Sequence, residues 1–100
     1  MESKKFAEAD KSKAVILDVR TPAEYNSGHV QGARSMDIYS KNFTEEINKL
    51  DKDQTYYVYC KTGIRSRNAA GYMRQAGFKN VCEIQGGILS LARTGVTLVK

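Results

Sequence analysis

The chain has 100 residues, which suits one small domain whose core can fold without disulfides or metal ions. A hydrophobic content of 41% and a charged content of 27% are ordinary for a globular protein, and no apolar run approaches the length of a membrane span. Two cysteines and one histidine cannot build a zinc cage, and a disulfide framework would normally use more cysteines.

The first ten residues contain no apolar signal core, so we expect a cytoplasmic protein with reduced thiols. No repeat, low-complexity stretch or linker divides the chain, which predicts one domain over residues 1–100.

The net charge of +5 fits general solubility, nucleic-acid binding or attraction of a small anion. Nucleic-acid modules usually interleave aromatic with basic residues, whereas Tyr56, Tyr57 and Tyr59 lie in a predicted core strand. We therefore expect neither a nucleic-acid nor a membrane partner. For the oligomeric state, we expect a monomer or a weak dimer. The basic residues that follow Cys60 are better placed to attract a small anion.

Strand and helix patterns alternate along the chain. The predicted elements are a helix at 4–10, a strand at 14–19, a short helix from 22, a strand at 35–38, a helix from 43, a strand at 55–59, a helix at 64–76, a strand at 81–84 and a helix at 88–93. This alternation implies a parallel sheet flanked by helices, which binds ligands at the carboxyl ends of its strands.

Capping signals delimit several of these helices. Thr21–Glu24 has the pattern of a capping box with proline at the first helical position. Asn42 and Glu45 predict a second capping pair. Gly77 predicts a left-handed cap at the end of the longest helix.

The most informative segment is Tyr59–Ser66, where Cys60 follows a predicted strand and precedes a helix. A helix terminus stabilises a nearby anion by about 0.3–1 kcal/mol, whereas one unit of pKa requires ~1.36 kcal/mol. Converging main-chain N–H groups must therefore supply the rest, helped by Lys61 or Arg65, and Gly63 permits the necessary curvature. Although a cysteine after a strand is often inert packing, these features predict that Cys60 is a nucleophilic thiolate.

Two ordered groups of residues carry a family resemblance. The first comprises Asp18-Val19-Arg20, Glu24-Tyr25, Gly28-His29-Val30 and Gly32-Ala33, and the second comprises Tyr59–Ser66, Ala69-Ala70, Gly77-Phe78, Val81 and Gly86-Gly87-Ile88. In these residues the chain resembles a rhodanese (sulfurtransferase) domain of the single-domain type. The resemblance implies an α/β fold with a central, mainly parallel five-stranded sheet and helices on both faces. The chain departs from the family pattern at Asp37, where a proline is common, and at Ser90-Leu91, where a tryptophan is common. The N-terminus also begins close to the first helix, so the first edge strand of the family is expected to be short or missing.

The resemblance also implies an activity. Cys60 would accept a sulfane sulfur from thiosulfate or a similar anionic donor and carry it as a persulfide. It would pass the sulfur to cyanide in an assay, or to a cellular thiol or protein in vivo, without a metal or organic cofactor. The residues implied to cradle the outer sulfur, chiefly through backbone N–H groups, are Lys61, Thr62, Gly63, Ile64 and Arg65.

Three further side chains have a structural interpretation beside a functional one. Arg20 is expected to form an ion pair with Asp18, and contact with an anionic substrate is the alternative. His29 is interpreted as a structural hydrogen-bonding residue and not as a general base. Cys82 is expected to pack, because it lies early in its strand and therefore far from Cys60.

Two other functions stay open. Cysteine phosphatases and arsenate reductases use a similar anion cradle, but four residues separate Cys60 from Arg65 and the phosphatase pattern requires one more. Arg67 would leave six, and the shorter loop should suit a single sulfur better than a phosphoryl group. The other alternative is a sulfur-relay or docking module of a larger system.

Overall fold

The computed structural model describes all residues, 1–100. Its centre is a four-stranded parallel sheet in the order β3-β1-β4-β5. The sheet strands are β1 (Ala14–Asp18), β3 (Arg34–Ser35), β4 (Thr55–Tyr59) and β5 (Asn80–Glu83). The two central strands pair over their whole length, with Ala14 opposite Thr55.

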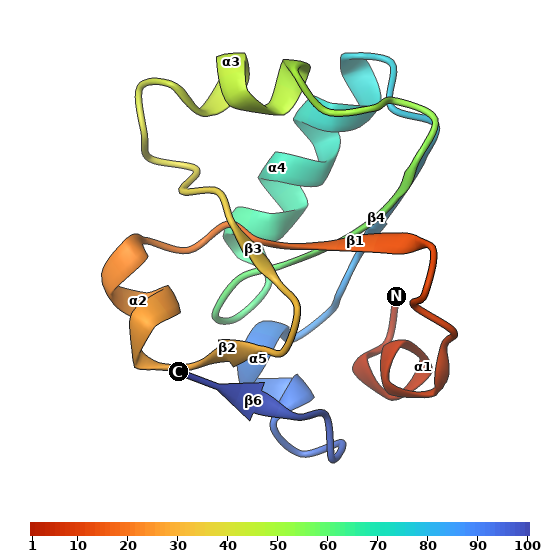
Figure 1. The fold of residues 1–100 in the computed structure, drawn as a ribbon, viewed down its shortest axis with the longest axis vertical. Helices are drawn as coiled ribbons and strands as arrows, with labels where there is room; N and C mark the ends of the chain where they lie inside the picture. The colour runs from red at the N-terminus through yellow and green to blue at the C-terminus, as the bar shows by residue number, and fades with distance from the viewer.

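Five helices flank the sheet. They are α1 (Ser3–Glu8), α2 (Pro22–Ser27), α3 (Phe43–Asn48), α4 (Ile64–Gln75) and α5 (Gly87–Leu91). In Figure 1, α3 and α4 lie above the sheet, α1 and α5 lie below it, and α2 lies beyond the carboxyl end of β1. No helix combines the length and the apolar character that crossing a membrane requires.

Two apolar core layers cover the two faces of the sheet, because successive strand residues point to opposite faces, and residues of the covering helices complete each layer. The first layer joins the sheet to α3 and α4, and it comprises Leu17, Val19, Met36, Phe43, Ile47, Tyr56, Val58, Cys60, Ala69, Met73 and Phe78. The layer facing α1 and α5 comprises Phe6, Ile16, Val30, Ala33, Tyr57, Tyr59, Ile84 and Leu91. Cys60 continues the alternation of side chains along β4, so it belongs to the same layer as Tyr56 and Val58, which faces α3 and α4.

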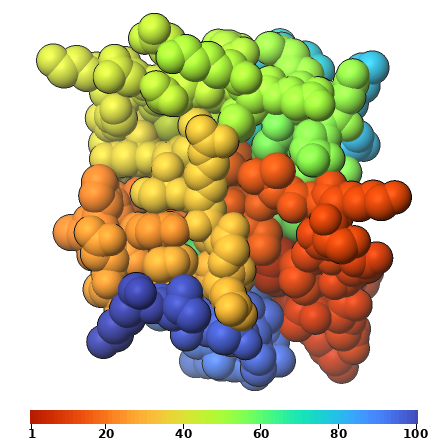
Figure 2. Space-filling view, in the orientation of Figure 1, coloured from red at the N-terminus to blue at the C-terminus, as the bar shows by residue number.

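The α/β class and the mainly parallel sheet are confirmed, but the sheet has four strands and not the five that the resemblance implied. The residues before β1 form only α1. The two remaining strands, β2 (His29–Val30) and β6 (Leu98–Val99), form a separate antiparallel pair. Figure 2 shows the C-terminal residues of this pair, in dark blue, lying against the orange segment that contains α2.

Two of the three predicted caps are confirmed. At the start of α2, the Glu24 N–H donates to Thr21 Oγ1 at 3.3 Å and the Thr21 N–H donates to Glu24 Oε1 at 3.2 Å. After α4, Gly77 has φ +99° and the Phe78 N–H donates to the Met73 carbonyl at 3.0 Å.

The predicted Asn42 cap is wrong. The Asn42 side chain makes no capping hydrogen bond to α3, and its backbone has φ −97° and ψ 5° instead of the extended conformation of an N-cap. Its own N–H donates to Ser40 Oγ at 3.2 Å, so the turn before the helix is organised by Ser40.

Candidate active site at the end of β4

The cysteine loop joins the carboxyl end of β4 directly to α4. Cys60 is the first residue after the strand, and Gly63 is the N-cap of the helix, with φ +119°. The Gly63 N–H points back and donates to Cys60 Sγ at 3.0 Å. A positive φ of this size is available to glycine without strain, so Gly63 allows the main chain to turn an N–H toward the sulfur.

The start of α5 supports this loop from the other side. The Ile88 N–H donates to the Cys60 carbonyl at 2.8 Å, and the Leu89 N–H lies 3.4 Å from the Lys61 carbonyl. A Cβ atom on Gly87 would lie 2.4 Å from the Lys61 carbonyl oxygen and 2.5 Å from that of Cys60. The loop therefore keeps its shape through main-chain contacts that require a glycine at position 87.

The sulfur of Cys60 is buried but surrounded by hydrogen-bonding groups. The Cys60 thiol donates to Ser66 Oγ at 3.5 Å, and the Ser66 hydroxyl donates to the Gly63 carbonyl at 3.1 Å. Cys60 and Ser66 are both 0% exposed. Burial, the largest single influence, raises the pKa of the thiol. The Ser66 hydroxyl and the N–H groups of Ser66, Gly63 and Thr62 lower the pKa, and their combined effect places it below its usual value. The thiol is therefore polarised toward the thiolate by hydrogen bonds from its own loop.

We expect Ser66→Ala to raise the pKa of Cys60, because the variant removes the hydroxyl that lowers this pKa while burial remains. The measurement is the pH titration of the ultraviolet thiolate absorbance, made in a Cys82→Ser background so that one thiol reports. The titration midpoint should move to higher pH. Ser12→Ala, at an exposed serine before β1, is the matched control and should not move it. An unchanged midpoint in Ser66→Ala would contradict the proposed role of the hydroxyl.

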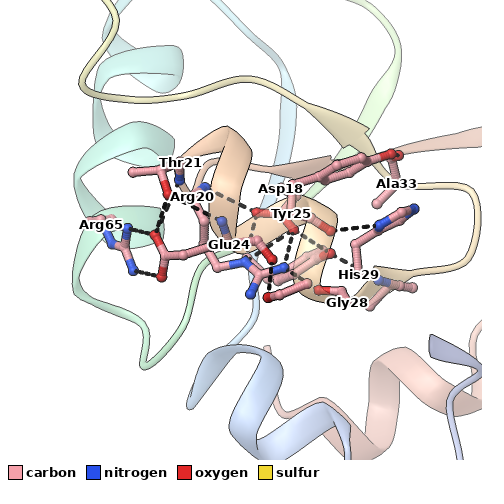
Figure 3. A network of polar contacts seen from close by, with 12 residues as sticks. Asp18, Arg20, Thr21, Glu24, Tyr25, Gly28, His29, Ala33 and Arg65 are labelled. Carbon is pink, nitrogen blue, oxygen red and sulfur yellow. Dashed lines mark hydrogen bonds and ion pairs between the residues drawn. The ribbon is translucent and has the colours of Figure 1, made fainter. Parts of the chain in front are cut away.

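Arg65 forms a bidentate ion pair with Glu24 of α2. The Arg65 Nη1 lies 2.6 Å from Glu24 Oε1, and the Nη2 lies 2.9 Å from Oε2 (Figure 3). Arg65 lowers the pKa of Glu24 to about 2, against the opposing effect of burial and with help from Thr21. The pair links the first turn of α4 to α2 and neutralises the Arg65 charge, so steering of a donor by Arg65 stays a prediction.

Arg20 lies in a buried polar network behind the loop. Its Nη2 donates to Asp18 Oδ2 at 2.7 Å and to the Gly28 carbonyl at 2.6 Å, and Arg20 is 4% exposed (Figure 3). The Tyr59 hydroxyl donates to the same Asp18 oxygen at 2.8 Å and accepts from the Val30 N–H at 3.0 Å. The predicted ion pair of Arg20 is confirmed, and this geometry gives no support to its alternative role in substrate contact.

His29 and Cys82 occupy structural positions. The His29 ring stacks on Tyr25, with centroids 3.7 Å apart, and its Nδ1 lies 2.9 Å from the Tyr25 carbonyl oxygen (Figure 3). Cys82 is a free thiol on β5 that packs against the layer facing α1 and α5. Cys60 belongs to the other layer, so the sheet lies between the two sulfur atoms.

The structure brings most of the predicted site residues together around Cys60. Lys61, Thr62 and Ile64 are exposed on the loop and at the first position of α4, while Gly63 is half-buried beside the sulfur. Sequence reasoning gave no role to Ser66, although its place three residues after the N-cap glycine was a usable signal. The sequence also indicated Glu24 only as a helix-capping residue, and its ion pair with Arg65 was not expected.

These features define a class of site: a cysteine held at the carboxyl end of a parallel strand by the main chain of a short loop. The family model described as rhodanese-like domain matches residues 3–94. The chain therefore belongs to the rhodanese-like domain family.

Curated relatives carry related descriptions. The chain is 32% identical to a sulfurtransferase of Allochromatium vinosum, over 91% of this chain and 83% of that protein. It is 38% identical to the probable adenylyltransferase/sulfurtransferase MoeZ of Mycobacterium tuberculosis, over 81% of this chain and 21% of that protein. A tRNA uridine(34) hydroxylase of Sodalis glossinidius is 39% identical, over 85% of this chain and 25% of that protein. The chain thus spans a fifth to a quarter of the length of the last two.

Solved structures agree with the family. A rhodanese-related protein from Thermoplasma volcanium superposes with a TM-score of 0.87 at 28% identity, over 99% of this chain and 95% of that one. The rhodanese-like domain of the Alr3790 protein from Anabaena sp. superposes with a TM-score of 0.86 at 29% identity, over 99% of this chain and 76% of that one.

Proposed function

We propose that this protein is a sulfurtransferase that carries a sulfane sulfur on Cys60. The observation that carries the proposal is the Gly63 N–H donated to Cys60 Sγ at 3.0 Å inside a loop whose N–H groups lower the pKa of the thiol. Such a loop stabilises an anionic sulfur without a cationic side chain in contact with it. The relative from Allochromatium vinosum that is described as a sulfurtransferase supports the same activity here.

The proposed reaction has two displacement steps. In the first, the Cys60 thiolate attacks the outer sulfur of thiosulfate, a new S–S bond forms, and sulfite leaves with the electron pair of the broken bond. In the second, a nucleophilic acceptor attacks the terminal sulfur of the persulfide, and Cys60 departs as a thiolate. Cyanide as acceptor would give thiocyanate, and a thiol would give a new persulfide. No external oxidant or reductant is consumed.

We propose that the loop residues Lys61, Thr62, Gly63, Ile64 and Arg65 surround the terminal sulfur with main-chain N–H groups. Lys61 is exposed and has no ion-pair partner in the structure, so it supplies the free positive charge that attracts an anionic donor. We also propose a cytoplasmic setting, because a reducing compartment preserves free thiols such as Cys60 and Cys82.

A phosphatase or arsenate reductase is the competing enzyme class. Four residues separate Cys60 from Arg65, and both carboxylate oxygens of Glu24 accept hydrogen bonds from the Arg65 guanidinium. The loop therefore offers a phosphoryl group fewer free donors than the phosphatase pattern supplies. The sulfur-relay module remains the second candidate, because the chain spans only 21% of the MoeZ relative.

We expect thiosulfate to add the mass of one sulfur atom to the protein at Cys60. The measurement is the intact mass before and after treatment, with peptide mapping to locate the added sulfur. Parallel turnover assays with thiosulfate and a phosphate monoester separate the two enzyme classes. Hydrolysis of the phosphate ester without a sulfur adduct would overturn the proposal, whereas thiocyanate production with cyanide would support it.

A further inference from the structure

Several strongly exposed apolar side chains come from segments next to the Cys60 loop. Four large hydrophobic residues are strongly exposed, and they are Tyr39 at 69%, Ile64 at 62%, Leu89 at 53% and Leu98 at 40%. Ile64 begins α4 directly after the cysteine loop, and the Leu89 N–H lies 3.4 Å from the Lys61 carbonyl. The Tyr39 ring lies 5.9 Å from the Arg65 guanidinium. Three of the four therefore border the loop.

Lys61, Thr62 and Ile64 of the loop are exposed, whereas Cys60 itself is buried. The structure has three grooves, one beside β3 and α3, one between α1 and residues 95–97, and one between residues 2–4 and the start of α5. None of them is lined by a residue of the loop 60–65. Small-molecule sites are usually concave, whereas exposed apolar patches that include an aromatic residue are typical of protein interfaces.

The same surface carries positive charge. Lys61 lies in the cysteine loop, and Arg67 lies three residues after Ile64 on α4. Both are exposed, and neither takes part in the four ion pairs of the structure. The adjacent carboxylate of Glu24 is neutralised by Arg65. We define the mouth surface as Tyr39, Lys61, Ile64, Arg67 and Leu89. It contains two cations without ion-pair partners, Lys61 and Arg67, and one carboxylate lies at its edge, where Asp37 Oδ1 accepts from the Tyr39 N–H at 2.9 Å.

We propose that the mouth surface is the docking site for an acidic protein that presents a cysteine thiol flanked by apolar residues, and that this protein receives the sulfur. The inference rests on the proposed sulfur-transfer function and names its acceptor class. The docked thiolate attacks the terminal sulfur of the Cys60 persulfide. A new S–S bond forms on the partner, the bond to Cys60 breaks, and its electron pair returns to the Cys60 thiolate.

The test uses three synthetic peptides of equal length, each with one central cysteine between two leucines. Their remaining positions are glutamate, lysine or glutamine. After thiosulfate loading, kcat/KM for sulfur transfer to the glutamate peptide should exceed that for the lysine peptide by about tenfold or more at low salt, and high salt should narrow the gap. Arg67→Glu should shift the preference toward the lysine peptide.

The apolar contribution has a matched control. Tyr39→Ser and Leu89→Ser should each lower transfer to the glutamate peptide by about fivefold or more, relative to the cyanide turnover of the same variant. Leu98→Ser removes an exposed leucine on β6, which pairs only with β2, and should stay within about twofold of the unmodified protein. Equal losses in all three variants would overturn the assignment of the surface.

A binding measurement separates this inference from the activity itself. Fluorescence anisotropy of labelled peptides with serine in place of cysteine, added to Cys60→Ser, requires no sulfur transfer. Selective binding of the glutamate peptide supports the docking site even if Cys60 takes up no sulfur. Intact cyanide turnover with no preference among the peptides overturns the docking site and leaves the proposed function standing. If the protein self-associates and Leu89→Ser abolishes this association, the mouth surface binds a second copy of the chain. This result would also overturn the proposed docking of an acidic acceptor protein.

Discussion

Cys60→Ser is expected to abolish sulfur uptake and thiocyanate formation, with a loss of about a thousandfold or more in turnover. A serine hydroxyl in the same position would remain protonated at neutral pH and would not form a persulfide. The surrounding loop should survive, because the Gly63 N–H can donate to an oxygen as well as to the sulfur. The measurement is thiocyanate production with thiosulfate and cyanide, together with the intact mass after thiosulfate treatment.

Cys82→Ser is the matched control for this result. Cys82 is partly buried on β5 and packs on the opposite face of the sheet from Cys60. We expect this variant to keep most of the activity, with a modest decrease in stability from placing a hydroxyl against apolar neighbours. Equal losses in the two variants would show that the assignment of the nucleophile to Cys60 is wrong.

Gly87→Ala is expected to disrupt the site without changing any side chain that contacts the sulfur. Gly87 has φ +59°, which strains an L-residue, and the new Cβ would lie 2.4–2.5 Å from the main chain of the cysteine loop. Either the loop or α5 must move, because backbone cannot rotate away as a flexible side chain can. The combined strain and overpacking should lower the free energy of unfolding by about 2 kcal/mol or more. Sulfur loading should fall by about tenfold or more, since the displaced loop misplaces its N–H groups.

Gly95→Ala is the control for Gly87→Ala, because it introduces the backbone strain of a positive φ without a contact to the cysteine loop. Gly95 also has a positive φ, +86°, but a Cβ there would meet no atom within 4 Å. This control should therefore lose only about 1–2 kcal/mol of stability and keep its rate of sulfur loading. Urea denaturation and the time course of the mass change after thiosulfate addition measure the two effects. Equal loading rates in both variants would contradict the supporting role of α5.

Local sequence signals predicted the framework of the site well. The β-branched and aromatic residues of Thr55–Tyr59 gave the observed bounds of β4, and Gly77 gave the end of α4. The position of Cys60 between this strand and helix followed from the chain order alone. Such features depend on residues close in sequence, where strand propensity, helical spacing and the conformational freedom of glycine act directly.

Two contacts between segments distant in sequence were not predicted. Glu24 and Arg65 lie 41 residues apart, and only the folded chain brings α2 beside the start of α4. The contact between Gly87 and the cysteine loop likewise forms only when the folded chain brings α5 beside that loop.

The Asn42 cap failed for a local reason. Ser40 organises the turn before α3, and a short-range pattern cannot decide between two competing polar side chains.

The placement of the two cysteines on opposite faces of the sheet has a consequence for the proposed persulfide of Cys60. A second thiolate within reach could attack the Cys60 sulfur, form an internal disulfide and expel hydrosulfide. The transferable sulfur would then be lost, and Cys60 would no longer be free to react. The hydrogen-bonded strands act as a partition against this side reaction. The terminal sulfur of the proposed persulfide is therefore expected to react only with a nucleophile that arrives from solution.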